Sequence, residues 1–187
     1  YGNVIPIFVD NGNSVTDNYD NDGWSITSST FVSPSTSITE SPNVDYLNNQ
    51  SKSIRLSEQI DLTNINGANA TFYAKWEIEN DWDYVQFEVS IDNGNSWIPQ
   101  CGLYTNQGSN NDSQPTGEPL YDGVQSEWIQ EEIDLNDFLG EEILIRFQFE
   151  SDGAVGADGF YFDDLMINIL DDGNLSNSMV NLIPFNL

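Results

Sequence analysis

The chain has 187 residues, enough to bury one sizeable core, and we expect one domain over residues 1–187. Its 31 acidic residues outnumber four basic ones, which gives a formal net charge of −27 at pH 7. This charge repels nucleic acid phosphates and anionic lipids, and no apolar run is long enough for membrane insertion, so we expect neither as a partner.

Short alternating runs of apolar and polar residues follow one another along the chain, separated by segments rich in Asn, Asp, Ser, Thr and Gly. The first such runs predict strands within residues 4–9, 24–31 and 53–56. In residues 70–78, Phe72 and Trp76 share the face expected in the core, and Lys75 lies on the opposite face.

The next run predicts a strand with one buried face and one wet face. Its inward side chains are Val85, Phe87, Val89 and Ile91, and its outward ones are Gln86, Glu88 and Ser90. The run ends at Asn93-Gly94, a pair that favours a tight hairpin before Trp97.

Further strands are expected within residues 128–133, 143–149 and 160–169, with a helical turn at 135–139. Residues 99–126 are too many for a hairpin loop, so we expect either a functional excursion or one that a metal orders, with Tyr104 and Tyr121 holding it in place. Residues 171–187 are either a terminal strand or a linker. Eight or more strands without a long helix predict an all-β, two-sheet antiparallel jelly-roll β-sandwich.

Three segments offer the oxygen ligands that calcium prefers: Asp10-Asn11, residues 41–45 and Asp163-Asp164. Adjacent residues of a strand point to opposite faces, so either Asp163 or Asp164 faces the core, where an unpaired carboxylate is costly. A bound cation compensates for such a charge. The alternative is a carboxylate that pairs with backbone N–H groups or with Arg146.

Other acidic residues leave alternatives open. Asp152 and Asp158 flank a Gly-rich loop and offer either a second ion site or a solvated hairpin. A glycosidase needs two carboxyl groups around a sugar bond, and residues 77–83 supply four acidic candidates. At this composition we expect those groups to be solvated or to bind metal. The chain has no histidine, which argues against most hydrolase mechanisms and against an enzyme.

Exposed aromatic rings offer a different function, because they can stack on sugars. We single out Trp82, Tyr104 and Tyr121 as possible ligand-binding aromatics, with Trp82 placed between two aspartates in a loop. Packing in the core is the alternative for each of them.

Several segments, taken in order and spacing, resemble a known group of domains. They lie at residues 33–35, 40–49, 76–79, 82–86, 90–97, 117–123, 145–147 and 158–164. They are similar to the MAM-like or immune inhibitor A-like jelly-roll domains that follow the catalytic domain in secreted Bacteroidetes zinc carboxypeptidases and metalloproteases.

The resemblance implies a non-catalytic, Ca²⁺-stabilised module that is secreted or held at the bacterial cell surface, with export by the type IX route. The ligands that it implies are Asp10, Ser41, Asn43, Asp45 and one of Asp163 or Asp164. Family members often have Asp where this chain has Glu40. No His-Glu-x-x-His motif is present, so the proteolytic activity of such parents does not transfer.

Three functions remain open at this stage. The first is an accessory module that packs against neighbouring domains of the same polypeptide or of a surface assembly. The second is a carbohydrate-binding module for a polysaccharide. The third is a subunit or cargo of a surface filament or secretion assembly, in which residues 4–9 and 180–185 pair with a neighbour's sheet edge.

Overall fold

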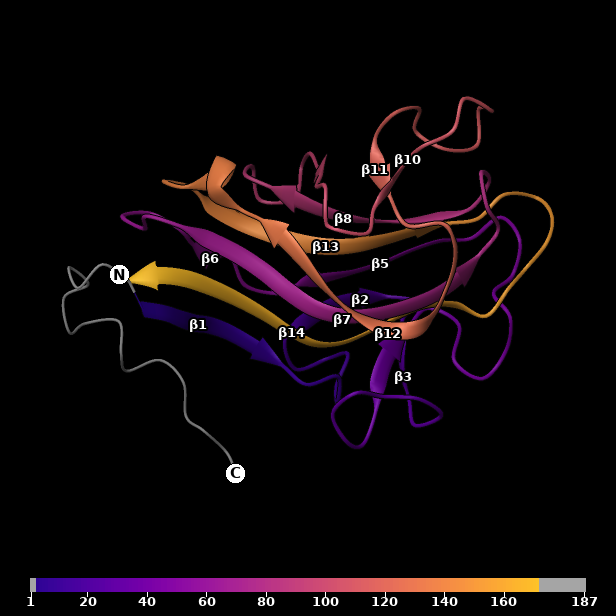
Figure 1. Ribbon diagram of the computed structural model, residues 1–187, viewed down its shortest axis with the longest axis horizontal. Coiled ribbons are helices and arrows are strands. Elements are labelled where there is room, and N and C mark those ends of the chain that lie inside the picture. Colours follow the sequence, from indigo (N-terminus) through magenta and orange to yellow (C-terminus); the bar gives the residue numbers. More distant parts are fainter. Residues whose placement is uncertain (1–2, 172–187) are drawn as a thin grey trace.

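The computed structural model describes residues 3–171, in which two antiparallel sheets pack face to face (Figure 1). The first sheet contains β1 (Asn3–Asp10), β3 (Ser25–Thr27), β4 (Ser37–Thr39), β7 (Ala68–Ile78), β12 (Gly123–Asp134) and β14 (Gly159–Asp171). The second contains β2 (Tyr19–Asp22), β5 (Ser51–Leu56), β6 (Ile60–Asp61), β8 (Tyr84–Ser90), β9 (Ile98–Pro99) and β13 (Glu142–Glu150). Outside them lie the ribbon of β10 (Asn106–Gln107) and β11 (Pro119–Leu120) and the 3-10 helix η1 (Asn136–Phe138).

The strand order confirms the predicted jelly-roll β-sandwich. The first sheet runs β12-β7-β14-β4-β3, with β1 also on β14, and the second runs β2-β5-β13-β8-β9, with β6 also on β13. β14 is the central strand, because β7 covers one edge while β4 and β1 share the other. Within residues 3–171, no helix is long and apolar enough to cross a membrane.

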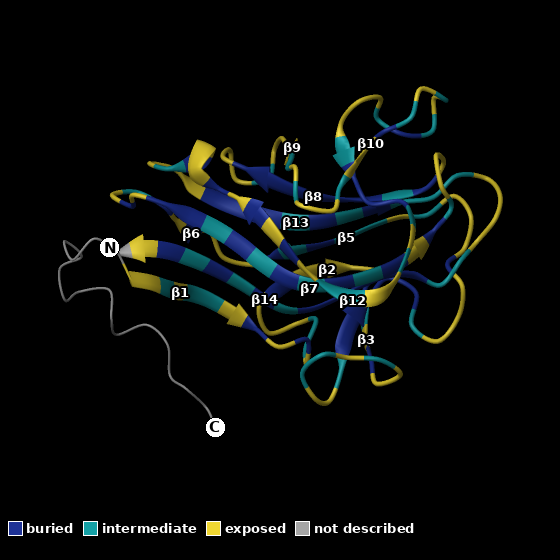
Figure 2. Cartoon of the chain, viewed as in Figure 1, coloured by how far each residue is buried: buried dark blue, intermediate teal, exposed yellow. Residues whose placement is uncertain are grey.

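Aromatic rings from both sheets fill the core, which Figure 2 shows in dark blue. Phe147 of β13 stacks on Phe162 of β14 at a centroid distance of 4.4 Å, and Phe147 also meets Phe72 of β7 edge-on at 5.1 Å. Fully burying one such side chain contributes about 1.5–3 kcal/mol. The alternation predicted for β7 and β13 is confirmed, and the very apolar strand predicted at 160–169 is β14, whose Phe160 and Phe162 belong to this cluster.

The outer face of β8 differs from the prediction. Gln86 and Glu88 are both 5% exposed rather than wet. The side-chain amide of Gln86 donates to the carbonyl of Pro119, and the carboxylate of Glu88 pairs with Arg146. Ile91, expected in the core, is exposed because the strand ends at Ser90. The excursion after β9 therefore supplies the cover that sequence alternation does not show.

The excursion at residues 99–126 and the predicted hairpin at Asn93-Gly94 each agree with the prediction only in part. Tyr121 anchors the excursion by pairing with Val85 of β8, which confirms part of the prediction, whereas Tyr104 is exposed. Asn93 and Gly94 have positive φ values of 60° and 84°, as the turn prediction requires. However, β8 ends at Ser90 and β9 begins only at Ile98, so the connection between them is longer than a tight hairpin.

Two other predictions need comment. The strand predicted over residues 24–31 is confined to β3, and a loop follows it. The predicted helical turn is confirmed as η1. Residues 172–187, including the predicted partner strand at 180–185, lie outside the described residues.

Candidate functional site

The first candidate site lies at the middle of β14, where two strands meet on one edge. Ile38 of β4 pairs with Phe162, and Asp10 at the end of β1 pairs with Leu165. Between these pairs the register of β14 against β7 shifts, and Asp164 has a positive φ of 52°. This irregularity is a β-bulge, and the carboxylate of Asp163 just before it lies beneath the loop at Val32 and Ser33.

Asp163 is the fully buried member of the aspartate pair, but it pairs with Tyr73 on the outer face of the first sheet, where the loop at Val32 covers it rather than the core. Its Oδ2 accepts hydrogen bonds from the backbone N–H groups of Val32 (2.7 Å) and Ser33 (3.0 Å), and its Oδ1 accepts one from Asp164 (2.8 Å). Burial raises the pKa of Asp163, and these N–H groups oppose the rise. Backbone N–H groups therefore pair with this carboxylate, while Arg146 pairs with Glu88.

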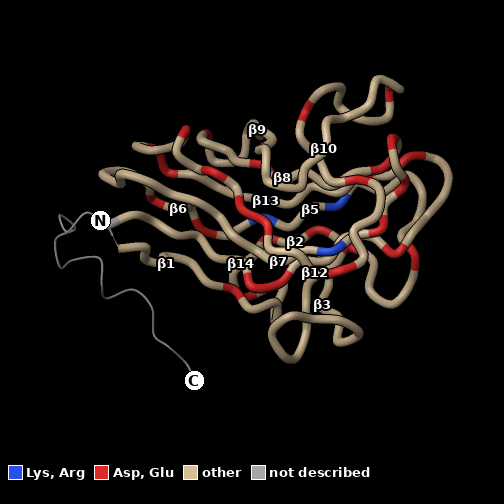
Figure 3. The backbone as a smooth tube through the Cα atoms, viewed as in Figure 1, with Lys and Arg blue, Asp and Glu red and all other residues tan. Residues whose placement is uncertain are grey.

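Asp10 approaches the same place from β1. It is buried, its Oδ1 accepts the backbone N–H of Gly12 at 2.8 Å, and burial raises its pKa. Gly12 has φ +69°, and a Cβ there would lie 2.7 Å from Oδ1 of Asp163 and 3.0 Å from the carbonyl oxygen of Thr36. We call this convergence of Asp10, Asp163 and the Thr36 carbonyl around Gly12 the Gly12 site. Figure 3 shows acidic residues at the end of β1 and on β14.

The other predicted ligands gather near the start of β14. The Ser41 hydroxyl donates to the carbonyl oxygen of Asp158 at 2.7 Å and lies 3.2 Å from Oε1 of Glu40. Asn43 and Asp45 follow it in an exposed loop. Their oxygens therefore face solvent rather than the core.

The six predicted metal ligands do not meet at one point. Asp10 pairs with Leu165, whereas Ser41 contacts Asp158, seven residues earlier in the chain. At the rise of an extended strand this separation is roughly 20 Å. One ion cannot bridge it, because calcium–oxygen distances are about 2.3–2.6 Å.

Glu40 holds the start of β14 in place through hydrogen bonds from the backbone of that strand. It is fully buried, and both of its carboxyl oxygens lie 3.1 Å from the backbone nitrogen of Phe160, which donates to them. Lys52 donates to the backbone carbonyl of Glu40 at 2.7 Å. Burial raises the pKa of the Glu40 carboxyl to about 7, so this group is partly protonated at neutral pH.

The predicted pair of Asp152 and Asp158 is separated by the fold. Asp158 accepts a hydrogen bond from the Tyr161 hydroxyl at 2.9 Å and lies 3.9 Å from the Lys75 ammonium. Asp152 instead joins Glu79 and Asp83, two residues that the sequence analysis treats as solvated or metal-binding. Glu79 and Asp83 share the β7–β8 turn, but no sequence signal links them to Asp152, which lies 69 residues after Asp83.

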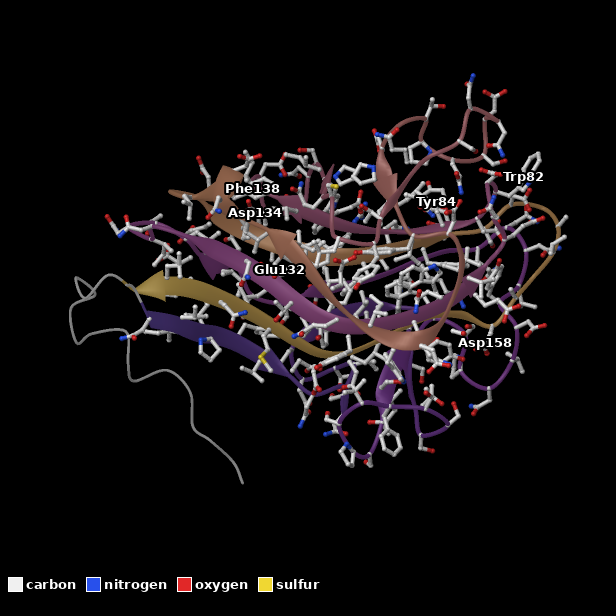
Figure 4. All side chains as sticks on the ribbon, viewed as in Figure 1. Trp82, Tyr84, Glu132, Asp134, Phe138 and Asp158 are labelled. Carbon is white, nitrogen blue, oxygen red and sulfur yellow. The ribbon has the colours of Figure 1, made fainter. Side chains whose placement is uncertain are left out.

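The three predicted ligand-binding aromatics have different environments. Trp82 and Tyr104 are 42% and 44% exposed, and Trp82 lies at the rim of the molecule in Figure 4. Tyr121 is fully buried, its ring packs on Trp76 at 5.1 Å, and its hydroxyl lies 3.1 Å from a carboxylate oxygen of Glu131. The ring of Tyr121 is therefore not accessible to a sugar.

Comparison with known families gives one clear match. The family model described as immune inhibitor A-like, MAM domain matches residues 35–179, which is more than half of the chain.

Three curated relatives match part of this chain. Residues of this chain are 24% identical over 119 positions to immune inhibitor A of Bacillus thuringiensis, covering 63% of this chain and 15% of that protein. The pre-pro-metalloprotease PrtV of Vibrio cholerae is 28% identical over 64% of this chain and 12% of its own length. Bacillopeptidase F of Bacillus subtilis is 28% identical over 51% of this chain and 6% of its own length. The chain thus spans only a small part of each relative.

Solved structures share the fold at low identity. The CBM22-1 xylan-binding domain of Paenibacillus barcinonensis Xyn10C matches with a TM-score of 0.52 and 12% identity, over 91% of this chain and 96% of that one. The K3 cleaved adhesin domain of Lys-gingipain from Porphyromonas gingivalis matches with a TM-score of 0.52 and 13% identity, over 87% and 98%.

Proposed function

The chain belongs to the immune inhibitor A-like MAM domain family, and from this membership we propose that it is a non-catalytic, calcium-stabilised accessory module of a larger exported bacterial protein. In this proposal it packs beside a peptidase-type domain of the same polypeptide, outside the cell. The observation that carries the proposal is the family match over residues 35–179, together with relatives that are proteases many times longer than this chain.

The way the buried carboxylates are used supports a non-catalytic role. Asp163 accepts backbone N–H groups of a neighbouring loop, and Glu131 accepts those of Leu103 and Tyr104 at 2.7 and 3.0 Å. Carboxylates engaged in this way hold loops in place. The absence of histidine from the chain removes the commonest general base.

The Gly12 site supports the calcium part of the proposal. The buried carboxylates of Asp10 and Asp163 and the carbonyl of Thr36 lie around Gly12, where a Cβ would clash with Asp163 and Thr36. These are hard oxygen donors of the kind that calcium requires. A bound ion offsets two buried negative charges that no Lys or Arg side chain contacts within the described residues. Ser41, Asn43 and Asp45 stay predicted ligands of an ion elsewhere.

The test uses the purified chain. We expect elemental analysis after dialysis to find bound calcium, and assays with protein and polysaccharide substrates to find no hydrolysis. Hydrolysis that co-purifies with the chain and disappears on Glu79→Gln or Asp83→Asn would contradict the non-catalytic role.

A carbohydrate-binding module is the second candidate function. It rests on the exposed Trp82 and Tyr104 and on a fold shared with a xylan-binding domain. A glycan array probed with the wild-type chain, Trp82→Ala and Tyr104→Ala tests it. Binding in the micromolar to millimolar range that Trp82→Ala abolishes favours this candidate, and an unchanged array signal excludes the role of Trp82.

A further inference from the structure

A second group of carboxylates lies where the β7–β8 and β13–β14 connections meet at one end of the sandwich. Glu79 directly follows β7, Asp83 directly precedes β8, and Asp152 follows β13. One carboxylate oxygen from each lies within 4.8 Å of the other two. The β7–β8 turn links the first sheet to the second, so the three groups lie where the two sheets are joined.

Two carboxylate oxygens in this group lack the partners that buried oxygens need. Asp83 is 0% exposed, and its Oδ2 makes no hydrogen bond, although its Oδ1 accepts the backbone N–H of Asp152 at 2.6 Å. Oε2 of Glu79 is likewise buried and unpaired. Burial raises the pKa of Asp83, and the nearby Tyr46 hydroxyl opposes part of this rise. Oδ2 of Asp83 nevertheless makes no hydrogen bond.

No basic side chain compensates for the three charges. The chain has four Lys and Arg residues, and all of them lie within the described residues. Their polar contacts are with other groups: Lys52 with the Glu40 carbonyl, and Arg55, Lys75 and Arg146 with Asp20, Asp158 and Glu88. Burial and the neighbouring charges of Asp83 and Asp152 raise the pKa of Glu79. An unpaired buried carboxylate of this kind is expensive.

We propose that Glu79, Asp83 and Asp152 form a binding site for a hard divalent cation of the calcium type, separate from the Gly12 site. The donors are all oxygens, which excludes a preference for zinc or copper. They come from two loops, the β7–β8 turn and the loop after β13, rather than from a preformed octahedral cage, which suits the flexible coordination of calcium better than that of magnesium.

Backbone hydrogen bonds already link the two loops that carry these carboxylates to the segment between β4 and β5, and the cation adds to these links. The backbone N–H of Asn49 donates to the carbonyl of Asp152 at 2.6 Å, and that of Glu79 donates to the Tyr46 hydroxyl at 3.0 Å. Both partners belong to the segment between β4 and β5. An ion held by Glu79, Asp83 and Asp152 therefore fixes this segment, the β7–β8 turn and the loop after β13 together.

Calcium stoichiometry gives the first test. Equilibrium dialysis followed by elemental analysis is applied to the full chain, to Asp83→Asn and to Asp163→Asn. Loss of one bound ion per chain in Asp83→Asn, with the ion retained in Asp163→Asn, supports this site. Unchanged stoichiometry in Asp83→Asn overturns it. Loss of an ion in Asp163→Asn alone indicates that calcium binds at the Gly12 site and not at Glu79, Asp83 and Asp152. The two variants therefore test the two proposed sites separately.

Thermal stability gives a second test that does not depend on a variant failing to fold. Without cation, Asp83→Asn and Glu79→Gln each remove one of three repelling charges, so the melting temperature with excess chelator stays equal to that of wild type or rises. With saturating calcium the order reverses, because the variants bind the ion more weakly. A variant that shifts the midpoint equally in both conditions contradicts the proposal.

The neighbouring tryptophan provides a direct readout. Trp82 lies between Glu79 and Asp83 in the turn, so Tb³⁺ bound there accepts energy from its indole ring. We expect tryptophan-sensitised terbium luminescence that calcium displaces, that falls strongly in Asp83→Asn and that weakens in Trp82→Phe. Exposed Ser51→Ala is the matched control. Luminescence unaffected by both Asp83→Asn and Trp82→Phe would place the ion elsewhere.

Discussion

The backbone N–H of Asp152 donates a 2.6 Å hydrogen bond to Oδ1 of Asp83, a fully buried carboxylate on another loop. The same relationship recurs elsewhere in the sandwich. The carboxylate of Asp163 accepts the backbone N–H of Val32 in a loop, and that of Glu40 accepts the backbone N–H of Phe160 at the start of β14. Charge-assisted bonds of this kind are stronger than neutral ones. Acidic residues that the composition presents as surface charge thus organise the connections between strands.

Gly12→Ala tests the Gly12 site. The substitution forces a side chain into a left-handed backbone conformation and to within 2.7 Å of the Asp163 carboxylate. We expect a loss of at least about 1–2 kcal/mol in the free energy of unfolding from the backbone conformation alone. Equilibrium unfolding in urea, with and without calcium, measures it. Ser14→Ala, nearby in the same loop, is the control, and equal stability of Gly12→Ala and wild type would contradict the described geometry.

Phe147→Ala tests the contact between the two sheets. The Phe147 ring stacks on Phe162 and meets Phe72 edge-on, so its removal leaves a cavity lined by rings of both sheets. We expect a loss of about 3–5 kcal/mol. Phe147→Leu, which keeps more of the volume, should lose much less. Denaturant unfolding in saturating calcium compares the two, and similar losses would indicate that the site is not tightly packed.

The Glu40 carboxyl predicts a pH dependence of stability. Its pKa is about 7 in the folded protein and near 4.5 when unfolded, so between these values the folded chain binds more protons. The stabilisation is therefore complete below the unfolded pKa and is lost as pH rises through about 7, by an amount on the order of 3 kcal/mol. In Glu40→Gln this group no longer titrates. The stability difference between Glu40→Gln and wild type should change with pH in this window, and a constant difference would refute the assignment.

The pair of Arg146 and Glu88 predicts strong coupling on the covered face of β8. Nε of Arg146 lies 2.5 Å from Oε2 of Glu88, which is 5% exposed, and the guanidinium lies 4.3 Å from the Trp97 ring centroid. Arg146→Met leaves the Glu88 charge buried and unpaired, at a cost of about 3–5 kcal/mol. The double variant Arg146→Met with Glu88→Met should recover much of the loss. Additive losses in this double-mutant cycle would show that the two side chains act independently.

Local alternation was sufficient to predict the strands that build the core. β7 and β13 carry apolar side chains at every second position, and the burial of those side chains follows that period. In β14 the β-bulge breaks the period, so that Phe160 and Phe162 face the core before it and Leu165, Ile167 and Ile169 after it. The wet face predicted for β8 was wrong, since burial there depends on a distant excursion. Alternation reports whether a face is apolar, whereas long-range cover of a polar face leaves no periodic signal.

The candidate sites were predictable only in part. The two adjacent aspartates, Asp163 and Asp164, within an apolar strand correctly indicated a buried carboxylate. Backbone N–H groups were one of the predicted partner types, and the structure identifies them as those of Val32 and Ser33. The convergence of Asp152 with Glu79 and Asp83 was not predictable. It depends on where β13 ends relative to the β7–β8 turn, a property of register that one sequence does not reveal.

A thermal melt of the purified chain, with calcium and with excess chelator, tests the central claim most directly, provided that metal content is measured on the same sample. A structural ion present at roughly a hundredfold above its dissociation constant contributes about 2.7 kcal/mol, which corresponds to several degrees in a domain of this size. We predict a clear drop in the midpoint with chelator and bound calcium without it. An unchanged midpoint with no metal detected would contradict the calcium-stabilised module.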